Sequence, residues 1–342
     1  MTARFKRWIV RPEDGGRVVD ILAKVGEHRS AIAEGRVFLG AKRITTMDAR
    51  TRPGDEVRIG EKPGGANNAV GDRGDRDALR APILFVKDGV VACNKPAGIP
   101  TVPDHVGASH SLVALIEKAA TTATTATAAK NAFVCASNLR VTSRLDRDVS
   151  GVVLFATDPR AAMRLHNART SGHYVRRYVA IAALGDLADV AQGKGSWTGP
   201  IGRGKTARHR AVFGPDAKPA QTHWKVVAFA GAKAPFALLA IEPVTGRTHQ
   251  IRVHASHAGM PLVGDSDYGG ARRITLSNGR VIALFRIALH AARVTVSFDS
   301  GDGLVAEAPI PADLARIWTE LGGAAEAWDT ARSCVLDSSL PA

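Results

Sequence analysis

Short β-rich runs mixed unevenly with a few helical segments fill residues 140 to about 311, and they restrict the fold more than any other feature of the chain. Examples are GVVLFAT, RRYVAIAAL, THWKVVAF, FALLAIEPV and VIALFRIALHAARVTVSF. A doubly wound sheet requires strands and helices that alternate evenly, and these runs do not. The sequence therefore predicts an α+β fold whose mainly antiparallel central sheet is flanked by helices.

The rest of the chain divides around this region. Residues 1–62 read as a small α/β module, because apolar side chains at helical spacing precede a second short helix, a Val-Phe-Leu strand and a turn-and-strand segment. Residues 63–82 are rich in Gly, Asn, Asp and Arg and are expected to form a flexible linker. The main domain is then expected over 83–322, with a C-terminal tail, 323–342, that adds a helix at most.

The charge balance suggests a polyanionic partner. Lys and Arg number 46 against 32 Asp and Glu, a net charge of +14. A generally solvated basic surface would give this composition equally well. The distribution favours a nucleic acid, because residues 160–178 hold five arginines, two histidines and no acid, and a second basic cluster spans 203–210. Such clusters suit contacts with phosphates.

Three stretches carry side chains suited to chemistry. In SRLDRDVSG, Arg144 and Asp146 stand just before an apolar strand, where charges are costly unless paired or used; alone, they are more typical of a surface turn. In RRYVAI, Tyr178 ends a basic segment and could stack on an unpaired base or belong to the core. In EPVTGRTHQIRVH, a Thr-Gly turn opens a helix whose N-terminus favours anions.

In this order the three stretches resemble the RluA-type family of pseudouridine synthases. That family has an Arg-Leu-Asp motif followed by Ser-Gly, a Lys/Arg-x-Tyr strand and a Thr-Gly-Arg-Thr-His-Gln-Ile-Arg-Val-His block. Further matches are NKPAG at 94–98, GPIGR at 199–203 and LHA at 289–291. The resemblance covers residue 83 to about 320 and implies a pseudouridine synthase fold. The N-terminal module resembles the small RNA-binding domain of the S-four type, a common companion in this family.

The resemblance implies an enzyme that isomerises uridine to pseudouridine in structured RNA. Asp146 matches the essential aspartate, Tyr178 the tyrosine that packs on the base, and Arg247 the arginine expected to pair with the catalytic carboxylate. Arg144 matches the arginine associated with flipping out the target base, a step that any enzyme rearranging a base requires. Contacts with RNA are also expected from Arg176, Arg203, His249 and Arg252.

The chemistry implied for Asp146 is physically coherent. An aspartate beside an arginine stays ionised, so it can act as a nucleophile or a base at neutral pH. Whether it attacks the sugar, attacks the base or removes a sugar proton is left open. No cofactor and no metal is expected. The favoured substrate is large-subunit ribosomal RNA, with transfer RNA second. No long apolar run or signal-peptide core is found, so a cytoplasmic protein without a membrane partner is expected. The sequence does not show the oligomeric state, and a monomer is the default expectation.

The chain departs from the family pattern in three places. Ser143 stands where the family usually has His, and Val149 where it usually has Thr. The first change could alter how the substrate is positioned, and the second removes a hydroxyl near the catalytic turn, but neither removes Asp146. A Thr/Ala-rich segment over 119–130 is unusual and is expected to be a surface insertion.

Other functions fit the sequence less well. Residues 199–206 match the phosphate-loop pattern GxxxxGK(S/T), but no apolar strand precedes them. His249, His254 and His257 lack the spacing of a zinc motif, and the three cysteines form no CxxC pair. The serious alternative is an RNA-binding ribosome-assembly factor without catalysis. The joint presence of Asp146, Tyr178 and Arg247 favours the enzyme.

Overall fold

The computed structural model describes most of the chain and divides it into two compact units, residues 1–73 and 74–342. The described residues are 5–60 (without 15, 26, 28–29, 34–35, 41, 45 and 47), 83–103, 111–122, 139–185, 193–206, 209–231 and 235–336. The predicted linker and most of the predicted Thr/Ala-rich insertion lie outside them. The first four residues of that insertion, 119–122, end helix α4.

The smaller unit packs short helices on a four-stranded antiparallel sheet of order β1-β4-β2-β3. Val18, Ile21 and Leu22, the apolar stripe of the first helix, are fully buried against the sheet residues Val57 and Ile59. The helical spacing in the sequence therefore marks the face that forms this core. Its elements are β1 (Phe5–Ile9), a 3-10 turn (Pro12–Asp14), α1 (Val18–Lys24), α2 (Ser30–Ala33), β2 (Val37–Leu39), β3 (Lys42–Arg43) and β4 (Glu56–Gly60).

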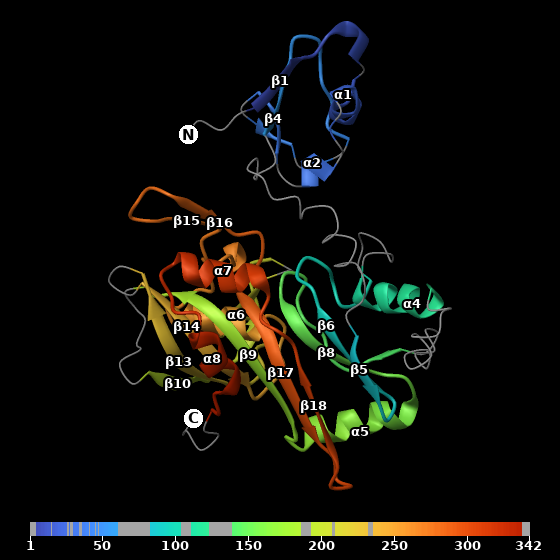
Figure 1. The fold of residues 1–342 in the computed structure, drawn as a ribbon, viewed down its shortest axis with the longest axis vertical. Helices are drawn as coiled ribbons and strands as arrows, with labels where there is room; N and C mark the ends of the chain where they lie inside the picture. Colours follow the sequence, from blue (N-terminus) through green and yellow to red (C-terminus); the bar gives the residue numbers. More distant parts are fainter. Residues whose placement is uncertain are drawn as a thin grey trace. The chain divides into compact units, whose positions relative to one another are not determined.

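The larger unit is built on a ten-stranded sheet of order β10-β13-β14-β9-β17-β8-β6-β5, with β18 beside β17 and β7 beside β8 (Figure 1). Among the described residues, only the β17–β8 pairing of this sheet is parallel, which confirms the predicted α+β class with a mainly antiparallel sheet. Its strands are β5 (Ile83–Lys87), β6 (Val90–Lys95), β7 (Arg140–Val141), β8 (Ser150–Ala156), β9 (Tyr174–Ala183), β10 (Lys194–Trp197), β13 (Thr222–Ala230), β14 (Phe236–Pro243), β17 (Leu289–Ser297) and β18 (Gly303–Glu307).

Two separate hairpins and five helices complete the described part of this unit. The hairpins are β11 (Ile201–Arg203) with β12 (Arg210–Val212), and β15 (Arg273–Thr275) with β16 (Val281–Ala283). The helices are α4 (Leu112–Thr122), α5 (Pro159–Thr170), α6 (Gln250–His257), α7 (Ala312–Glu320) and α8 (Ala327–Ser333), with a 3-10 turn at Ser266–Tyr268. No helix within the described ranges is both long enough and apolar enough to cross a bilayer.

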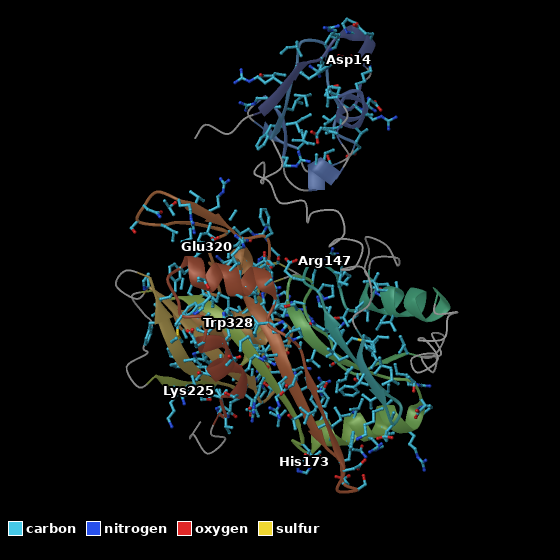
Figure 2. All side chains as sticks on the ribbon, in the orientation of Figure 1. Asp14, Arg147, His173, Lys225, Glu320 and Trp328 are labelled. Carbon is cyan, nitrogen blue, oxygen red and sulfur yellow. The ribbon has the colours of Figure 1, made fainter. Side chains whose placement is uncertain are left out.

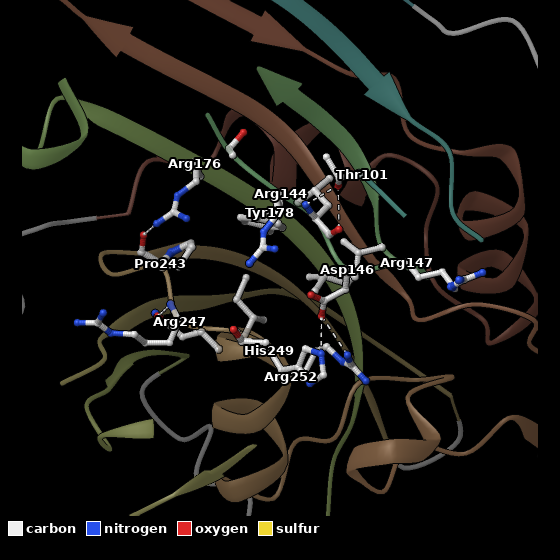
Figure 3. A pocket seen from close by; sticks show the side chains of 18 of the residues that line it. Thr101, Arg144, Asp146, Arg147, Arg176, Tyr178, Pro243, Arg247, His249 and Arg252 are labelled. Carbon is white, nitrogen blue, oxygen red and sulfur yellow. Dashed lines mark hydrogen bonds and ion pairs between the residues drawn. The ribbon is translucent and has the colours of Figure 1, made fainter. Parts of the chain in front are cut away.

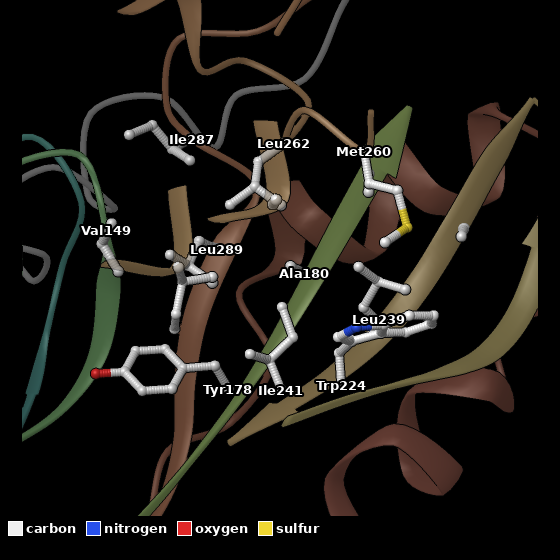
Figure 4. Close-up of a cluster of buried hydrophobic side chains, with 14 of the residues drawn as sticks. Val149, Tyr178, Ala180, Trp224, Leu239, Ile241, Met260, Leu262, Ile287 and Leu289 are labelled. Carbon is white, nitrogen blue, oxygen red and sulfur yellow. The ribbon is translucent and has the colours of Figure 1, made fainter. Parts of the chain in front are cut away.

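The central strand β9 separates two cores because successive side chains of a strand point to opposite faces. Tyr178 and Ala180 face one core, which includes Ile251 of α6 (Figure 4). Val179 and Ile181 face the other, which α7 and α8 cover. Helix α6 and the two C-terminal helices therefore lie on opposite faces of the same strand, and only the α6 face contributes to the cleft described below.

The segment predicted as a C-terminal tail contributes to the second core. Trp328 of α8, labelled in Figure 2, is 5% exposed and stacks edge-on against the fully buried Trp318 of α7. Ala331 is buried in the same cluster. A Cβ at Gly323 would overlap the Trp318 ring, so this glycine lets the chain pass over the indole. The domain core therefore continues to α8, beyond the boundary at 322 that the sequence suggested.

Candidate active site

A cleft of about 1070 Å³ in the larger unit brings the three sequence motifs together. It is lined by residues 143–147 and Val149 of the first motif with the preceding residues 141–142, by Arg176 and Tyr178 of β9, and by Pro243 and residues 245–252 of the third motif (Figure 3). Residues 100–103, Arg169 of α5 and Leu289 of β17 complete the lining. Segments that are far apart in the sequence thus form one site, as their joint occurrence predicted.

Asp146 lies in the loop between β7 and β8, and two buried side chains anchor the backbone on either side of it. Thr101 Oγ1 donates to the carbonyl of Leu145 and accepts from its N–H, both at 3.0 Å. Lys95 is fully buried, and its ammonium donates to the carbonyls of Pro96, Ile99 and Arg147 at 2.7–2.9 Å. The loop is therefore tied down just before and just after Asp146, which fixes the direction of the carboxylate.

The carboxylate of Asp146 pairs with Arg252 of α6. Arg252 Nη1 lies 3.0 Å from Asp146 Oδ2, and His249 Nε2 lies 3.8 Å from the same oxygen. The family resemblance implied this pairing for Arg247, and that prediction is wrong. Arg247 lines the cleft, but its Nε donates to the carbonyl of Pro219 at 3.1 Å. Arg252 also lines the cleft, but its guanidinium is held by carboxylates and its side chain is 5% exposed, so the expected contact with RNA stays a prediction.

Arg252 is oriented by two further aspartates and an aromatic ring. Asp265 Oδ2 and Oδ1 accept from its Nε and Nη2 at 2.7 and 2.8 Å, and Asp267 accepts from Nη2 at 2.9 Å. The Tyr268 ring centroid lies 4.8 Å from the guanidinium carbon. Burial alone would lower the pKa of Arg252, but the hydrogen bonds and charge of Asp265, followed by the charge of Asp146, outweigh it and raise that pKa.

His249 joins this network from the N-terminus of α6. Its backbone has a φ of 57°, in the left-handed region, which is uncommon for a residue other than glycine. Its Nδ1 lies 2.8 Å from the hydroxyl of Tyr268, which also accepts a hydrogen bond from the backbone N–H of Arg210. Burial lowers the pKa of His249 below its ordinary value, against the opposing effect of Asp146. The imidazole is therefore neutral at neutral pH.

Gln250 shapes the turn that leads into α6. Its Oε1 accepts from the backbone N–H of Arg247 at 2.9 Å and from the hydroxyl of Thr245 at 2.7 Å. Its Nε2 donates to the carbonyl of Gln221 and to the hydroxyl of Thr222. A buried amide needs this many partners to avoid a desolvation penalty. The Thr-Gly-Arg-Thr-His-Gln block thus folds into a turn in which the side chain of Gln250, at its end, is hydrogen-bonded to Thr245 and Arg247 near its start.

Tyr178 and Val149 form the apolar floor next to Asp146. Tyr178 is 8% exposed, and burial raises its pKa. Val149 is 2% exposed in the same cluster as Tyr178 and Leu289. A threonine at 149 would bring a hydroxyl into this apolar contact, and such a group is costly when it lacks a partner. The valine that departs from the family pattern therefore packs the floor of the cleft.

The remaining predicted RNA contacts separate in space. Arg144 is exposed and lines the cleft, and Arg176 and His249 line it too. Arg203 is not among the lining residues; it lies on the β11–β12 hairpin, where its Nε is 3.2 Å from Asp216. The structure thus leaves Arg203 exposed on the β11–β12 hairpin and brings the other predicted site residues into one cleft: Asp146, Tyr178, Arg144, Arg176, Arg247, His249 and Arg252.

The residues that match the phosphate-loop pattern form part of the β11–β12 hairpin. Of His249, His254 and His257, the central one makes hydrogen bonds to residues of the protein. Residues 201–203 form β11, and β12 follows at 210–212, so the match does not lead from a strand into a helix. His254 bonds to Thr222 through Nδ1 and to the carbonyl of Gly199 through Nε2. Across the described ranges, no group of three or more His, Cys, Asp or Glu is placed to hold a metal ion.

Several important side chains were not assigned a role from the sequence. They are Asp265, Asp267, Tyr268, Gln250, Lys95 and Thr101. The Gly-Asp and Tyr-Gly pairs around 264–269 belong to the third stretch, but a carboxylate there could equally belong to a surface turn. Their role depends on contacts with α6 that only the folded chain shows.

The chain is similar to known RNA pseudouridine synthases. Residues 89–257 match the family model described as RNA pseudouridylate synthase. The chain is 35% identical over 267 residues to the protein named uncharacterized RNA pseudouridine synthase YhcT of Bacillus subtilis (strain 168). The matched region covers 78% of this chain and 79% of that protein. The chain therefore belongs to the RNA pseudouridine synthase family and is an enzyme of the RluA type.

Two further comparisons define its neighbours within and beyond bacteria. Ribosomal large subunit pseudouridine synthase D of Nitrosomonas europaea is 32% identical over 243 residues, covering 70% of this chain and 65% of that protein. The solved structure of human RNA pseudouridylate synthase domain containing 4 superimposes with a TM-score of 0.53 at 21% identity, covering 72% of this chain and 95% of that one. The structural likeness supports the pseudouridine synthase fold.

Proposed function

We propose that this protein converts uridine to pseudouridine in large-subunit ribosomal RNA and that Asp146 is its catalytic residue. The observation that carries the proposal is the carboxylate of Asp146, which lines the cleft, is 28% exposed, and is ion-paired with the nearly buried Arg252. A carboxylate held in one orientation in a cleft can react with a bound sugar or base without a further loss of rotational entropy.

The isomerisation itself balances without a redox partner. The bond from C1′ of the ribose to N1 of the uracil breaks, the base turns, and a bond from C1′ to C5 forms. The proton on C5 is then lost, and N1 gains one. A carboxylate such as Asp146 can serve as nucleophile towards the sugar or the base, or as the base that removes a proton. In each of these roles the carboxylate of Asp146 must face the cleft in which the uridine binds.

The surroundings of Asp146 suit a uracil removed from its stack. An enzyme that acts on a base must extrude it and usually holds it against an aromatic or apolar surface. Tyr178, Val149 and Leu289 supply such a surface next to Asp146. Arg144, exposed at the opening of the cleft, is available to fill the space that the flipped base leaves. We assign these residues to base packing and base flipping.

Ribosomal RNA is the preferred substrate for two reasons. Several relatives are named ribosomal large subunit pseudouridine synthase D. The N-terminal unit also has the helix, helix and sheet order of the S-four type of RNA-binding domain, and it exposes Arg17 and Arg50, whose backbones form a bridge. We propose that this unit binds RNA, that transfer RNA is the second substrate to test, and that the protein acts as a cytoplasmic monomer.

The test is to incubate the purified protein with unmodified ribosomal RNA and transfer RNA and to map pseudouridine by chemical labelling and primer extension. The matched variants are Asp146→Ala and Asp148→Asn. Asp148 lies in the same loop but does not line the cleft. We expect a primer-extension stop in the ribosomal RNA treated with the wild type or with Asp148→Asn, and no stop with Asp146→Ala.

Further outcomes separate the alternatives. A stop that appears only in the transfer RNA pool keeps Asp146 as catalytic residue and replaces the substrate. If the wild type binds both RNA pools in a salt-dependent way and marks neither, the protein acts as a non-catalytic assembly factor. If Asp146→Ala produces the same stop as the wild type, the catalytic assignment is wrong.

A further inference from the structure

Two arginines of the cleft have neutral partners only. Arg169, in the last turn of α5, donates from Nη1 to the carbonyl of Thr142 at 2.9 Å. Arg176, on β9, donates from Nη2 to the carbonyls of Pro243 and Thr245 at 3.1 and 2.6 Å. No carboxylate within the described ranges forms an ion pair with either side chain, so two positive charges line the cleft without a counter-charge.

The neighbouring arginines show that this is not a general feature of the surface. Arg177, the next residue along β9, pairs with Glu242 at 3.4 Å. Arg164, one turn and a half before Arg169 on α5, pairs with Asp302 at 2.8 Å and lies over the Phe298 ring. The arginine-rich stretch of 160–178 is therefore divided by the fold into charges that the protein neutralises and charges that it leaves available in the cleft.

Arg169 and Arg176 are also held close together at an electrostatic cost. Burial, followed by the positive charge of Arg176, lowers the pKa of Arg169. The Nε of Arg176 is buried and has no hydrogen-bond partner. Like charges in a partly desolvated place repel each other, and an unpaired buried donor is costly. An anion that binds beside the two guanidinium groups would relieve their repulsion and gain charge-assisted hydrogen bonds.

The position of Arg176 relates this pair to the reacting base. Arg176 and Tyr178 are two residues apart on β9, so their side chains point to the same face and their Cα atoms are about 7 Å apart. Both line the cleft, and Arg176 lies beyond Tyr178 on the side away from Arg147 in Figure 3. Gly246 leaves room for the guanidinium, because a Cβ there would lie 3.2 Å from Arg176 Nη1.

We propose that Arg169 and Arg176 form a binding site for one backbone phosphate of the RNA strand, next to the uridine that enters the cleft. The inference rests on the proposed function, since it takes the uridine to lie against Tyr178 and Asp146. A guanidinium pair recognises a phosphate by charge and by its planar donors, without regard to base sequence. The site therefore fixes the register of the strand in the cleft and leaves the choice of sequence to other contacts.

The first experiment measures binding of a short fluorescein-labelled oligouridylate by anisotropy over a range of salt concentrations. The variants are Arg169→Gln and Arg176→Gln, and the control is Arg160→Gln, which removes an exposed charge from the first turn of the same helix outside the cleft. Each cleft variant should bind about tenfold more weakly, the effect of losing one charged hydrogen-bonded contact. Its log–log salt slope should fall by about 0.7, as expected for one phosphate of a single strand.

Two results of this experiment reject the site. Cleft variants that bind like the wild type with an unchanged salt slope would show that no phosphate is bound there. An Arg160→Gln control that weakens binding as much as they do would show that binding is spread over the basic surface. Arg176→Lys tests the role of charge: it should keep the wild-type slope, and a slope as low as that of Arg176→Gln would contradict the proposal.

A second arm tests whether the ligand is the RNA backbone or a free anion. Phosphate groups near the mapped uridine are replaced one at a time by neutral methylphosphonates. One replacement should weaken binding by the wild type and leave binding by Arg176→Gln unchanged. If no position behaves in this way while inorganic phosphate competes with the oligouridylate, the pair binds free phosphate and the proposal fails. Absence of any pseudouridine would reject the proposed function alone, because the oligouridylate arm needs no reaction.

Discussion

The guanidinium of Arg252 joins Asp146 to Asp265 across the floor of the cleft. Its Nη1 lies 3.0 Å from Asp146, while Nε and Nη2 bind both carboxylate oxygens of Asp265 at 2.7 and 2.8 Å. Asp265 is 1% exposed, so its own position is set by the packed interior. A planar fork held from one side in two bonds cannot rotate freely, and the direction of Asp146 is therefore set from Asp265 through Arg252.

Replacing Asp265 by Asn should lower kcat much more than it weakens RNA binding. The amide keeps the size of the side chain but offers one acceptor oxygen. Arg252 therefore loses one of its two hydrogen bonds to residue 265, and its guanidinium is displaced relative to Asp146. A misplacement of this kind costs about 10²-fold in rate. Asp267→Asn is the matched control, because Asp267 is 56% exposed and makes a single bond. Single-turnover rates and RNA affinity of the folded variants decide the point; equal rates for Asp265→Asn and the wild type would show that Arg252 needs no such support.

Gly151 should be far less tolerant of alanine than other glycines of similar conformation. Its φ is 116°, and a Cβ would overlap the backbone of Ala291 where β8 and β17 run parallel. Gly172 has a φ of 82° but open space around it. Backbone strain alone costs about 1–3 kcal/mol, so Gly172→Ala should lose that amount. Gly151→Ala should lose more than about 3 kcal/mol, since the overlap is added to the strain. Urea unfolding of both variants measures the difference, and equal losses would contradict the close approach of the two strands.

His290 should make the protein less stable as the pH falls below about 6.5. The side chain is fully buried, its Nδ1 lies 2.7 Å from the hydroxyl of Ser150, and burial followed by the charge of Arg286 lowers its pKa to about 3. Between these two pH values the unfolded chain binds a proton that the folded chain does not. The free energy of unfolding should therefore fall by about 1.4 kcal/mol per pH unit in that window and be unaffected above it.

The measurement is urea unfolding of the wild type and His290→Asn between pH 7 and pH 5. The variant keeps an acceptor for Ser150 but cannot be protonated in this range. Its stability should depend less on pH, by about one bound proton. The other histidines contribute equally to both proteins, so identical pH dependence would mean that His290 is not the group responsible.

Trp328 should matter for the stability of the whole larger unit, although it lies in the segment that the sequence suggested was a tail. Its indole is 5% exposed against Trp318. Trp328→Ala should cost about 3–5 kcal/mol, the usual loss for a large aromatic side chain removed from a core. Asp329→Ala, at an exposed position of the same helix, should cost less than about 0.5 kcal/mol. A loss for Trp328→Ala no larger than that of Asp329→Ala would show that α8 is dispensable.

The sequence predicted those features that depend on local pattern or on the order of motifs. The apolar spacing of Val18, Ile21 and Leu22 predicted the core face of α1, and the irregular β-rich runs predicted the antiparallel sheet. The motifs around Asp146, Tyr178 and Arg247 predicted a shared site, and all three residues line one cleft. Local sequence was sufficient here because each feature is repeated over several residues or has a fixed spacing.

The choice between Arg247 and Arg252 could not be made in this way. Both arginines follow the same Thr-Gly turn, and the sequence does not show which one faces Asp146. Gln250 closes the turn and directs Arg247 towards Pro219, while one turn of α6 brings Arg252 under the Asp146 loop. Similarly, the core role of Trp328 depends on Gly323 and Trp318, and a short helix after a glycine pair does not reveal it.

The central claim is that Asp146 performs the chemistry and is not needed to bind RNA. Its most direct test is a single-turnover assay of Asp146→Asn with saturating RNA that contains the mapped uridine, together with the affinity for the same RNA. We expect affinity close to that of the wild type and no pseudouridine, because the amide fits the space but is neither a nucleophile nor a base. Pseudouridine formed by Asp146→Asn at a rate near that of the wild type would contradict the catalytic role of Asp146.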